Sequence, residues 1–234
     1  MARRVPKKLP AVKFPTEMSR LVDQFREGEP SYRLASYNET QLRREFLDGM
    51  LGCLGWDVTN VAGNHNALKD VVHEDALRIG GNIKAPDYGI RVGGKRVFFI
   101  EAKKPAVNIR DGISSAYQLR RYAWSAKLPL SILTDFEEFA VYDCRVKPNA
   151  DDKAHTARLM YLTYMDYEEK WDELYSLFSK PAVLNGSLET FAETHRSPRG
   201  TQTVDNAFLN ESRGGENYLR SKYVVKTNLS QLGN

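Results

Sequence analysis

The sequence has little cysteine and no long apolar run. Cys53 and Cys144 are its two cysteines, too few for a disulfide framework or a cysteine zinc site, so a reducing cytoplasm is the expected setting. No stretch approaches the roughly 20 apolar residues of a membrane-spanning helix, so no membrane partner is expected. The N-terminus is basic but lacks the apolar segment of a signal peptide.

Motifs of several enzyme classes are also missing. There is no G-x-x-x-x-G-K-[ST] phosphate loop and no N/D-P-P-Y/F tetrapeptide, so these residues encode neither ATP-driven translocation nor adenine methylation. No G-x-S-x-G occurs, so a serine hydrolase has no support. The four histidines form neither H-x-x-x-H nor H-E-x-x-H, which argues against a zinc enzyme.

The chain does contain enough apolar material for one core. With 234 residues and 41% hydrophobic side chains, it can bury one good core and little more. Its net charge of +4 permits a polyanionic partner without demanding one. We expect a basic flexible arm and a short helix in residues 1–30, ended by Gly28-Glu29-Pro30-Ser31. The folded domain should span residues 31–196, and residues 197–234 should be a linker or docking tail.

The spacing of apolar residues predicts alternating helices and strands. Asn38 is a suitable N-cap with Gln41 three residues later, and the apolar residues that follow have helical spacing as far as Leu54. The patterns then predict a strand opening at 71–73, two strands within 85–105, a helix at 111–126, strands at 128–134 and 138–143, and helices at 164–179 and 187–195.

The centre of the chain is the pair of strands within residues 85–105. Apolar residues fill both faces of its second strand before the charges of Glu101 and Lys103 begin. Unpaired buried charges cost several kcal/mol or change their pKa, so something must reward their presence. A strand-end ion pair within reach of solvent is the ordinary explanation of Glu-x-Lys. A catalytic or metal-binding pair is the other.

The turn of this hairpin determines which acids can meet. If the loop were only Gly93-Gly94, Asp87 would lie opposite Ile100, and the carboxylates of Asp87 and Glu101 would face opposite sides. A longer loop, a β-bulge or a kink near Pro86 is therefore required to bring them together.

Pro86-Asp87 followed by Glu101-x-Lys103, with a glycine turn between, resembles the signature of the PD-(D/E)xK nuclease superfamily. The predicted order of helices and strands is that of the family's αβββαβ core. The resemblance implies an α/β, restriction-endonuclease-like fold, in which helices flank a central mixed sheet.

The same residues suit a magnesium site. The carboxylates of Asp87 and Glu101, with the carbonyl oxygen of Ala102, form an oxygen ligand set for a hard cation, Mg²⁺, with Mn²⁺ expected to substitute. Lys103 would then sit beside the attacking water, orienting or deprotonating it and balancing the phosphate charge. In many family members a glutamate from the first core helix joins the metal shell, and Glu39 is the positional match. An ordinary Glu39–Arg43 surface pair is the competing interpretation.

The helix after Glu-x-Lys carries further candidates. Gln118 and Tyr122 lie one helical turn apart, as Q-x-x-x-Y, which resembles a motif that RecB-type members carry near the active site. Tyr122 is equally interpretable as a core residue. We expect Gln118, Arg121, Tyr122 and Lys104 to contact DNA.

A longer resemblance joins these segments. Y-N-E-T-Q-L-R-R-E-F-L-D and L-G-W-D-V within 37–58, K-A-P-D-Y at 84–88, E-A-K-K-P at 101–105 and Q-L-R-R-Y-A-W-S at 118–125 resemble the N-terminal nuclease region of bifunctional, type IIG-like restriction-modification enzymes and of type I restriction subunits.

This resemblance implies a Mg²⁺-dependent DNA endonuclease that acts on double-stranded DNA as the cleavage domain of a restriction-modification system. It also implies a methyltransferase or specificity domain or subunit as partner, so the chain is expected to be a fragment or a free-standing relative. A catalytically silent module that binds nucleic acid or docks to a partner is the alternative. A small-molecule enzyme is disfavoured because the chain has no Gly-rich nucleotide loop.

Overall fold

The computed structural model describes residues 12–79 and 81–195. Its helical elements are α1 (Thr16–Tyr32), α2 (Glu39–Leu42), the π-helical η1 (Arg43–Leu47), α3 (Asp48–Cys53), the 3₁₀ turns η2 (Asn66–Leu68) and η3 (Tyr164–Asp166), α4 (Ile113–Ser125), α5 (Trp171–Phe178), α6 (Lys180–Leu184) and α7 (Ser187–Thr194). Its strands are β1 (Val71–His73), β2 (Leu77–Ile79), β3 (Asn82–Lys84), β4 (Tyr88–Val92), β5 (Lys95–Ala102), β6 (Leu130–Thr134), β7 (Glu138–Asp143) and β8 (Arg158–Thr163).

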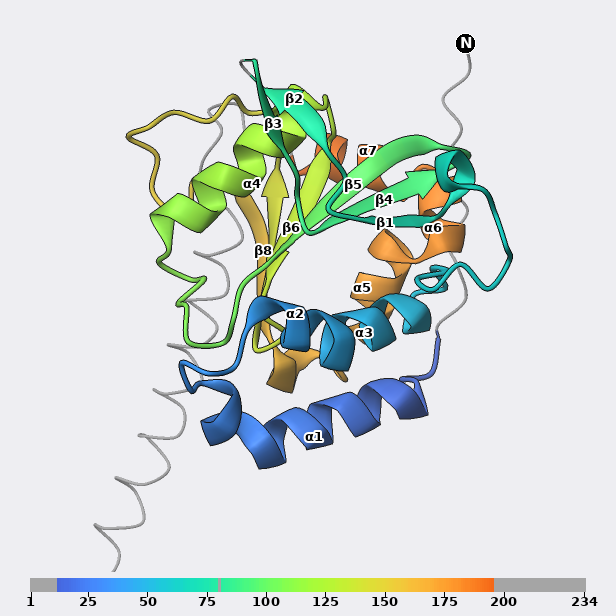
Figure 1. The fold of residues 1–234 in the computed structure, drawn as a ribbon, viewed down its shortest axis with the longest axis vertical. Helices are drawn as coiled ribbons and strands as arrows, with labels where there is room; N and C mark the ends of the chain where they lie inside the picture. The colour runs from blue at the N-terminus through green and yellow to red at the C-terminus, as the bar shows by residue number, and fades with distance from the viewer. Residues whose placement is uncertain (1–11, 80, 196–234) are drawn as a thin grey trace, which may run out of the picture.

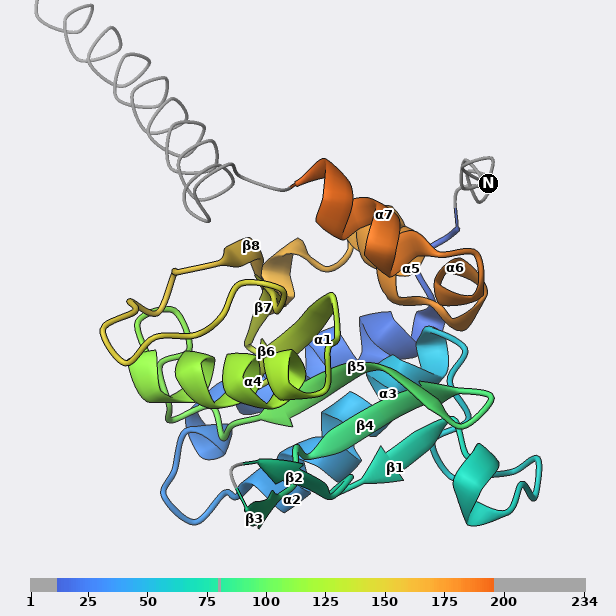
Figure 2. The same ribbon diagram turned by 90° about the horizontal axis from the view of Figure 1, so that it is seen from above.

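A six-stranded mixed sheet with the order β1-β4-β5-β6-β7-β8 forms the centre of the fold (Figure 1). The β5–β6 pair is parallel and the other pairs are antiparallel. One core cluster joins one face of the sheet to α1, α2, α3 and the C-terminal helices, whereas α4 and the β2–β3 hairpin pack on the other face (Figure 2). The expected mixed α/β fold and its αβββαβ order are confirmed, from the helical stretch at 39–53 through β1, β4, β5 and α4 to β6.

The β4–β5 hairpin contains the irregularity that its sequence requires. Val92 pairs with Lys95 across the glycine turn, but the register shifts between Arg91↔Arg96 and Ile90↔Phe98. The extra residue in β5 makes a β-bulge, and beyond it Tyr88 pairs with Ile100. One residue further along, this register places Asp87 opposite Glu101. Of the longer loop, the bulge and the kink that the sequence left open, the structure has the bulge.

Helix α1 is longer than the sequence suggested. The short helix expected within residues 1–30 begins at Thr16 and extends to Tyr32, through the glycine and proline that were expected to end it. A Cβ at Gly28 would lie 2.6 Å from the ring of Tyr32, so glycine lets that ring pack against the helix. Met18, Leu21, Val22 and Phe25 of α1 are in the core. The expected boundary at residue 30 therefore falls inside a core helix, while residues 1–11 of the arm and the tail at 197–234 lie outside the described residues.

The first core helix begins as expected and then widens. The Asn38 side chain accepts a hydrogen bond from the Gln41 backbone amide, and the Gln41 side chain accepts one from the Asn38 backbone amide, which confirms the predicted cap. From Arg43 to Leu47 the helix has π geometry before it continues as α3. Wide turns of this kind are often found at functional sites.

The region after residue 145 departs most from expectation. Strand β8 was not predicted, and the helix expected from Tyr164 begins with a 3₁₀ turn and becomes α-helical at Trp171. Asp166 takes part in a capping box with Thr163 at that turn.

Of the helices formed by the described residues, none has the length and apolar character needed to cross a membrane.

Candidate active site

Asp87 is held at the entrance to β4 by its backbone and both carboxylate oxygens. Its carbonyl accepts a hydrogen bond from the Glu74 amide at 2.9 Å, and its Oδ2 accepts one from the Ala102 amide at 2.8 Å. Its Oδ1 accepts a hydrogen bond from Arg43 Nη1 at 3.1 Å. Burial raises the pKa of Asp87 above its ordinary value, although the Ala102 amide and the charges of Arg43 and Lys103 act in the opposite direction.

Glu101 lies at the end of β5 with only 4% of its side chain exposed. Its Oε1 accepts hydrogen bonds from Lys103 Nζ at 2.8 Å and from Gln118 Nε2 at 2.6 Å. Its Oε2 is buried without a hydrogen-bond partner in the structure. Burial raises the pKa of Glu101 to about 7, and the nearby charges of Asp87 and Glu39 act in the same direction, against the opposing charge of Lys103.

Lys103 and Glu39 complete a cluster with Asp87 and Glu101, called here the carboxylate cluster. The Lys103 amide donates to the Thr134 carbonyl at 3.0 Å, which ties the residue to the end of the neighbouring parallel strand. Its Nζ lies 2.8 Å from Glu101 Oε1 and 3.8 Å from Glu39 Oε1. Glu39 is the first residue of α2 and keeps 42% of its side chain exposed. The surface pair with Arg43 considered as an alternative is not the pairing observed, because Arg43 ion-pairs with Asp87 and Glu74.

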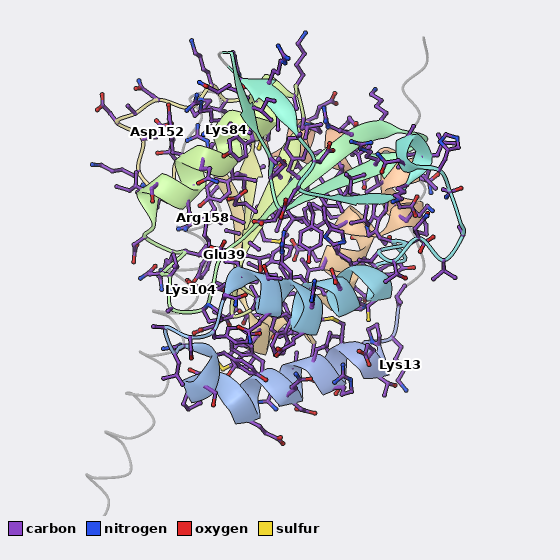
Figure 3. All side chains as sticks on the ribbon, viewed as in Figure 1. Lys13, Glu39, Lys84, Lys104, Asp152 and Arg158 are labelled. Atoms are coloured by element: carbon purple, nitrogen blue, oxygen red, sulfur yellow. The ribbon has the colours of Figure 1, made fainter. Side chains whose placement is uncertain are left out.

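The residues expected to contact DNA divide into two groups. Gln118 and Tyr122 lie on the inner side of α4. Gln118 donates to Glu101, whereas Tyr122 is a core residue, as the alternative interpretation expected, with its pKa raised by burial and by the charge of Glu101. Arg121 is exposed on α4, and Lys104 is partly exposed at the start of the loop that follows β5. Lys104 and Glu39 lie on the side of the molecule where α2 begins (Figure 3).

The donor set fits a divalent cation, although no closed ligand cage is preformed. Among the described residues, no three His, Cys, Asp or Glu side chains are gathered closely enough to hold a metal ion as they stand. Both main carboxylates nevertheless have a raised pKa, and Glu101 Oε2 is a buried oxygen without a donor. A cation at this point would supply the charge and the partner that these oxygens lack.

Sequence reasoning missed the contribution of Arg43. Its guanidinium reaches Asp87 from η1 and lies 5.9 Å from the centre of the Tyr88 ring, whose hydroxyl donates to Asp48 at 2.8 Å. The sequence places Arg43 one turn after Glu39, which suggested a pair within the helix. The close approach of the helix to the start of β4 appears only in the fold.

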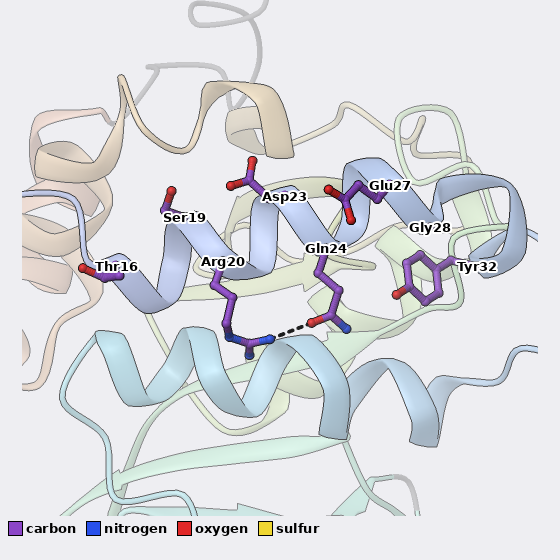
Figure 4. Close-up of a pocket in the computed structure, with 8 residues that line it drawn as sticks. All are labelled: Thr16, Ser19, Arg20, Asp23, Gln24, Glu27, Gly28 and Tyr32. Carbon is purple, nitrogen blue, oxygen red and sulfur yellow. Dashed lines mark hydrogen bonds between the residues drawn. The ribbon is translucent and has the colours of Figure 1, made fainter.

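An open pocket along α1 contains none of the predicted site residues (Figure 4). Arg20 Nη1 donates to Gln24 Oε1 at 2.8 Å on its wall, beside Asp23, Glu27 and Tyr32. The carboxylate cluster is therefore separate from this pocket and lies at the ends of β5 and β6.

Two comparisons by sequence find restriction enzymes. Residues 36–150 match the family described as the type I restriction enzyme R protein N terminus. The type II restriction enzyme and methyltransferase RM.Eco57I of Escherichia coli is 35% identical over 218 residues, which cover 92% of this chain but 22% of that protein. The type IIG restriction endonuclease BpuSI superposes on 71% of this chain and 18% of its own, with 13% identity and a TM-score of 0.34.

This chain thus spans less than a quarter of the length of the RM.Eco57I protein. The expected relationship to restriction enzymes is confirmed: residues 36–150 resemble the N terminus of the type I restriction enzyme R protein, and most of the chain is similar to a restriction enzyme and methyltransferase.

Proposed function

We propose that this chain is the DNA-cleaving module of a restriction-modification system, a member of the PD-(D/E)xK superfamily that hydrolyses phosphodiester bonds of double-stranded DNA with Mg²⁺. The observation that carries the proposal is the convergence of Asp87, Glu101 and Lys103 at the ends of paired strands, with Glu101 Oε2 buried and without a partner. An assembly made only for stability would gain little from like charges in a desolvated position.

Asp87, Glu101 and the Ala102 carbonyl would hold the metal, with Glu39 joining directly or through water. Oxygen donors of this kind suit Mg²⁺, and Mn²⁺ should replace it. When bound, the ion would lower the pKa of a coordinated water and offset charge on the phosphate. Gln118 would keep Glu101 in place through its 2.6 Å hydrogen bond.

Lys103 would act as a fixed positive charge. Burial works to lower its pKa, but the charge and hydrogen bond of Glu101 outweigh burial, so the pKa of Lys103 is raised. The protonated ammonium is therefore favoured, and it can orient the attacking water and balance the charge of the phosphate. Of the two roles that the sequence left open for Lys103, orientation is the one this environment supports.

Partner and setting belong to the same proposal. RM.Eco57I is named as both a restriction enzyme and a methyltransferase, and it is several times longer than this chain. We infer that the present chain works with a methyltransferase or specificity domain or subunit, in the cytoplasm. Arg121 and Lys104 would contact the DNA backbone beside the carboxylate cluster.

The test is cleavage of supercoiled plasmid by the full chain with Mg²⁺, with Mn²⁺ and with a chelator. Lys103→Ala, Asp87→Ala and Glu101→Ala should each lower the rate by about a thousandfold or more while the far-ultraviolet circular dichroism stays unchanged. Lys95→Ala changes an exposed lysine at the opposite end of β5 and should cut like the wild type.

Near-normal cutting by any of the three site variants would remove the nuclease proposal. A wild-type chain that binds DNA but never cuts it, with either metal, would instead support the silent binding module.

A further inference from the structure

Arg43 occupies the position beside Asp87 where a metal ion would bring positive charge. Its Nη1 is 3.1 Å from Asp87 Oδ1, and 13% of its side chain is exposed. The other Asp87 oxygen and its carbonyl are bonded to backbone amides, which are fixed. Arg43 is therefore the only side-chain donor, in the described part of the chain, that holds Asp87, and it is the one that can move away.

A second acceptor for Arg43 stands next to the first. Glu74 Oε1 lies 3.8 Å from Arg43 Nη2, and 74% of the Glu74 side chain is exposed, so this carboxylate is free to follow the guanidinium. Glu74 is fixed through its backbone, because its amide donates to the Asp87 carbonyl. Glu74 directly follows β1, and its φ of 51° is unusual for a residue with a side chain.

The charges around Asp87 leave room for one divalent ion. With all groups ionised, the four carboxylates of Asp87, Glu101, Glu39 and Glu74 exceed the two cations Arg43 and Lys103 by two charges. A divalent ion would cancel this excess, but Arg43 holds Asp87 Oδ1, the oxygen that has no backbone donor. An ion that binds this oxygen therefore competes with the guanidinium, and Glu74 is the second acceptor already beside it.

We propose that Arg43 is a positioning residue that substitutes for the metal ion in the metal-free protein and passes to Glu74 when the ion binds. The inference rests on the proposed metal site and adds a competition at Asp87 Oδ1. Arg43 would keep the carboxylate of Asp87 oriented without metal, and it would also weaken metal binding, so that removing it makes the ion bind more tightly.

The test of this competition is the binding of Mn²⁺ alone to the full chain. Binding is measured by electron paramagnetic resonance, as the loss of the free-ion signal. Arg43→Gln should bind Mn²⁺ about tenfold more tightly, within the usual range for coupling between two ligands of one site. Arg43→Lys keeps a cation in place and should stay near the wild type. Arg44→Gln, an exposed neighbour on the same helical stretch, is the matched control and should change nothing.

Glu74 provides a test of opposite sign. Glu74→Gln removes the second acceptor and should weaken Mn²⁺ binding about threefold, because Arg43 then has nowhere to go. In the Arg43→Gln background the same change should have less than about a twofold effect, the screened influence of an exposed carboxylate. Saturating Mn²⁺ should also raise the melting temperature of Arg43→Gln more than that of the wild type.

Equal or weaker Mn²⁺ binding by Arg43→Gln would overturn the inference, as would a Glu74 effect of the same size in both backgrounds. These failures leave the nuclease proposal standing if Asp87→Asn abolishes the Mn²⁺ binding of the wild type. A wild-type chain that binds no Mn²⁺ would overturn the metal site and this inference together.

Discussion

The two ends of the β4–β5 hairpin hold buried carboxylates in opposite ways. Near the turn, Asp75 is 2% exposed and receives two arginines, with its Oδ1 2.5 Å from Arg91 Nη2 and 2.6 Å from Arg96 Nη2. Burial acts to raise the pKa of Asp75, but these ion pairs outweigh it and the pKa is lowered. At the far end, Glu101 is equally buried, yet its pKa is raised to about 7.

The contrast shows that the charge of Asp75 stabilises the fold, whereas the charge of Glu101 destabilises it. Around Asp75 the backbone itself is shaped to fit the carboxylate, because a Cβ at Gly89 would lie 2.1 Å from Asp75 Oδ2. Around Glu101 one oxygen is left without a donor. Buried charges that are fully paired resist removal, whereas under-compensated ones are commonly found where a ligand or substrate completes them.

The largest expected effect is on stability, with opposite signs at the two ends. Asp75→Ala leaves two arginines without their partner and should lower the free energy of unfolding by about 3 to 5 kcal/mol. Glu101→Gln removes an under-compensated charge, so the free energy of unfolding should stay the same or rise. Urea unfolding of both variants without metal checks this. A loss of similar size in both would erase the distinction between the two ends.

The pH dependence of stability should separate the same residues. Glu101 has its pKa raised from 4.5 to about 7, so between these values the folded protein keeps a proton that the unfolded chain releases. Raising the pH through this window should therefore lower the free energy of unfolding, by at most about 3 kcal/mol. Asp75 has a lowered pKa, so its contribution is present above 3.8 and is lost as the pH falls through its folded pKa.

Glu101→Gln should reduce the first slope and leave the acid one unchanged, because Asp87, whose pKa is also raised, still titrates in the variant. Urea unfolding of the wild type and the variant in chelator, from acid to neutral pH, gives both slopes. If the slope in the upper window is the same in both proteins, another group titrates there.

The sequence predicted those parts of the fold that local patterns determine. The cap at Asn38, the helix that became α4, and the β-bulge between β4 and β5 each follow from residues close together in the chain. Strand β8 and the end of α1 depend on partners in other elements: β8 pairs with β7, and the ring of Tyr32, the last residue of α1, packs against Phe46 of η1. Local propensity cannot register such contacts.

The same limit applies to the candidate site. The motif residues Asp87, Glu101 and Lys103 lie on consecutive segments, so their meeting could be predicted from the hairpin alone. The Arg43–Asp87 ion pair joins residues 44 positions apart, and neither residue signals the other in the sequence.

Two neighbouring arginines of α4 extend the comparison to the surface. Arg120 is 1% exposed and ion-pairs with Asp152 at 2.6 Å, whereas Arg121 is exposed. Arg121→Ala should weaken binding to duplex DNA about fivefold and reduce the salt dependence by about 0.9, the value for one phosphate contact. Fluorescence anisotropy in a Lys103→Ala background measures both, with Lys95→Ala as control. An unchanged salt slope would place Arg121 away from the DNA.

The smallest expected effect concerns Glu39, which lies between the two classes of charge. It is 42% exposed like a surface acid, yet it lies 3.8 Å from Lys103 Nζ and its charge contributes to raising the pKa of Glu101. As a surface charge, Glu39→Gln would cost less than about 0.5 kcal/mol and leave cleavage alone. As a metal-shell residue, the same change should raise the Mg²⁺ concentration for half-maximal cleavage about threefold, and added metal should restore the rate.

A titration of cleavage against Mg²⁺ decides between these roles of Glu39, with Glu45→Gln on the same helical stretch as control. Superimposable curves for Glu39→Gln and the wild type would return Glu39 to the surface charges. A rate that stays low at saturating Mg²⁺ would have another meaning, because a higher Mg²⁺ concentration can compensate for weaker metal binding but cannot restore the position of Lys103. Glu39 would then act on the lysine rather than on the ion.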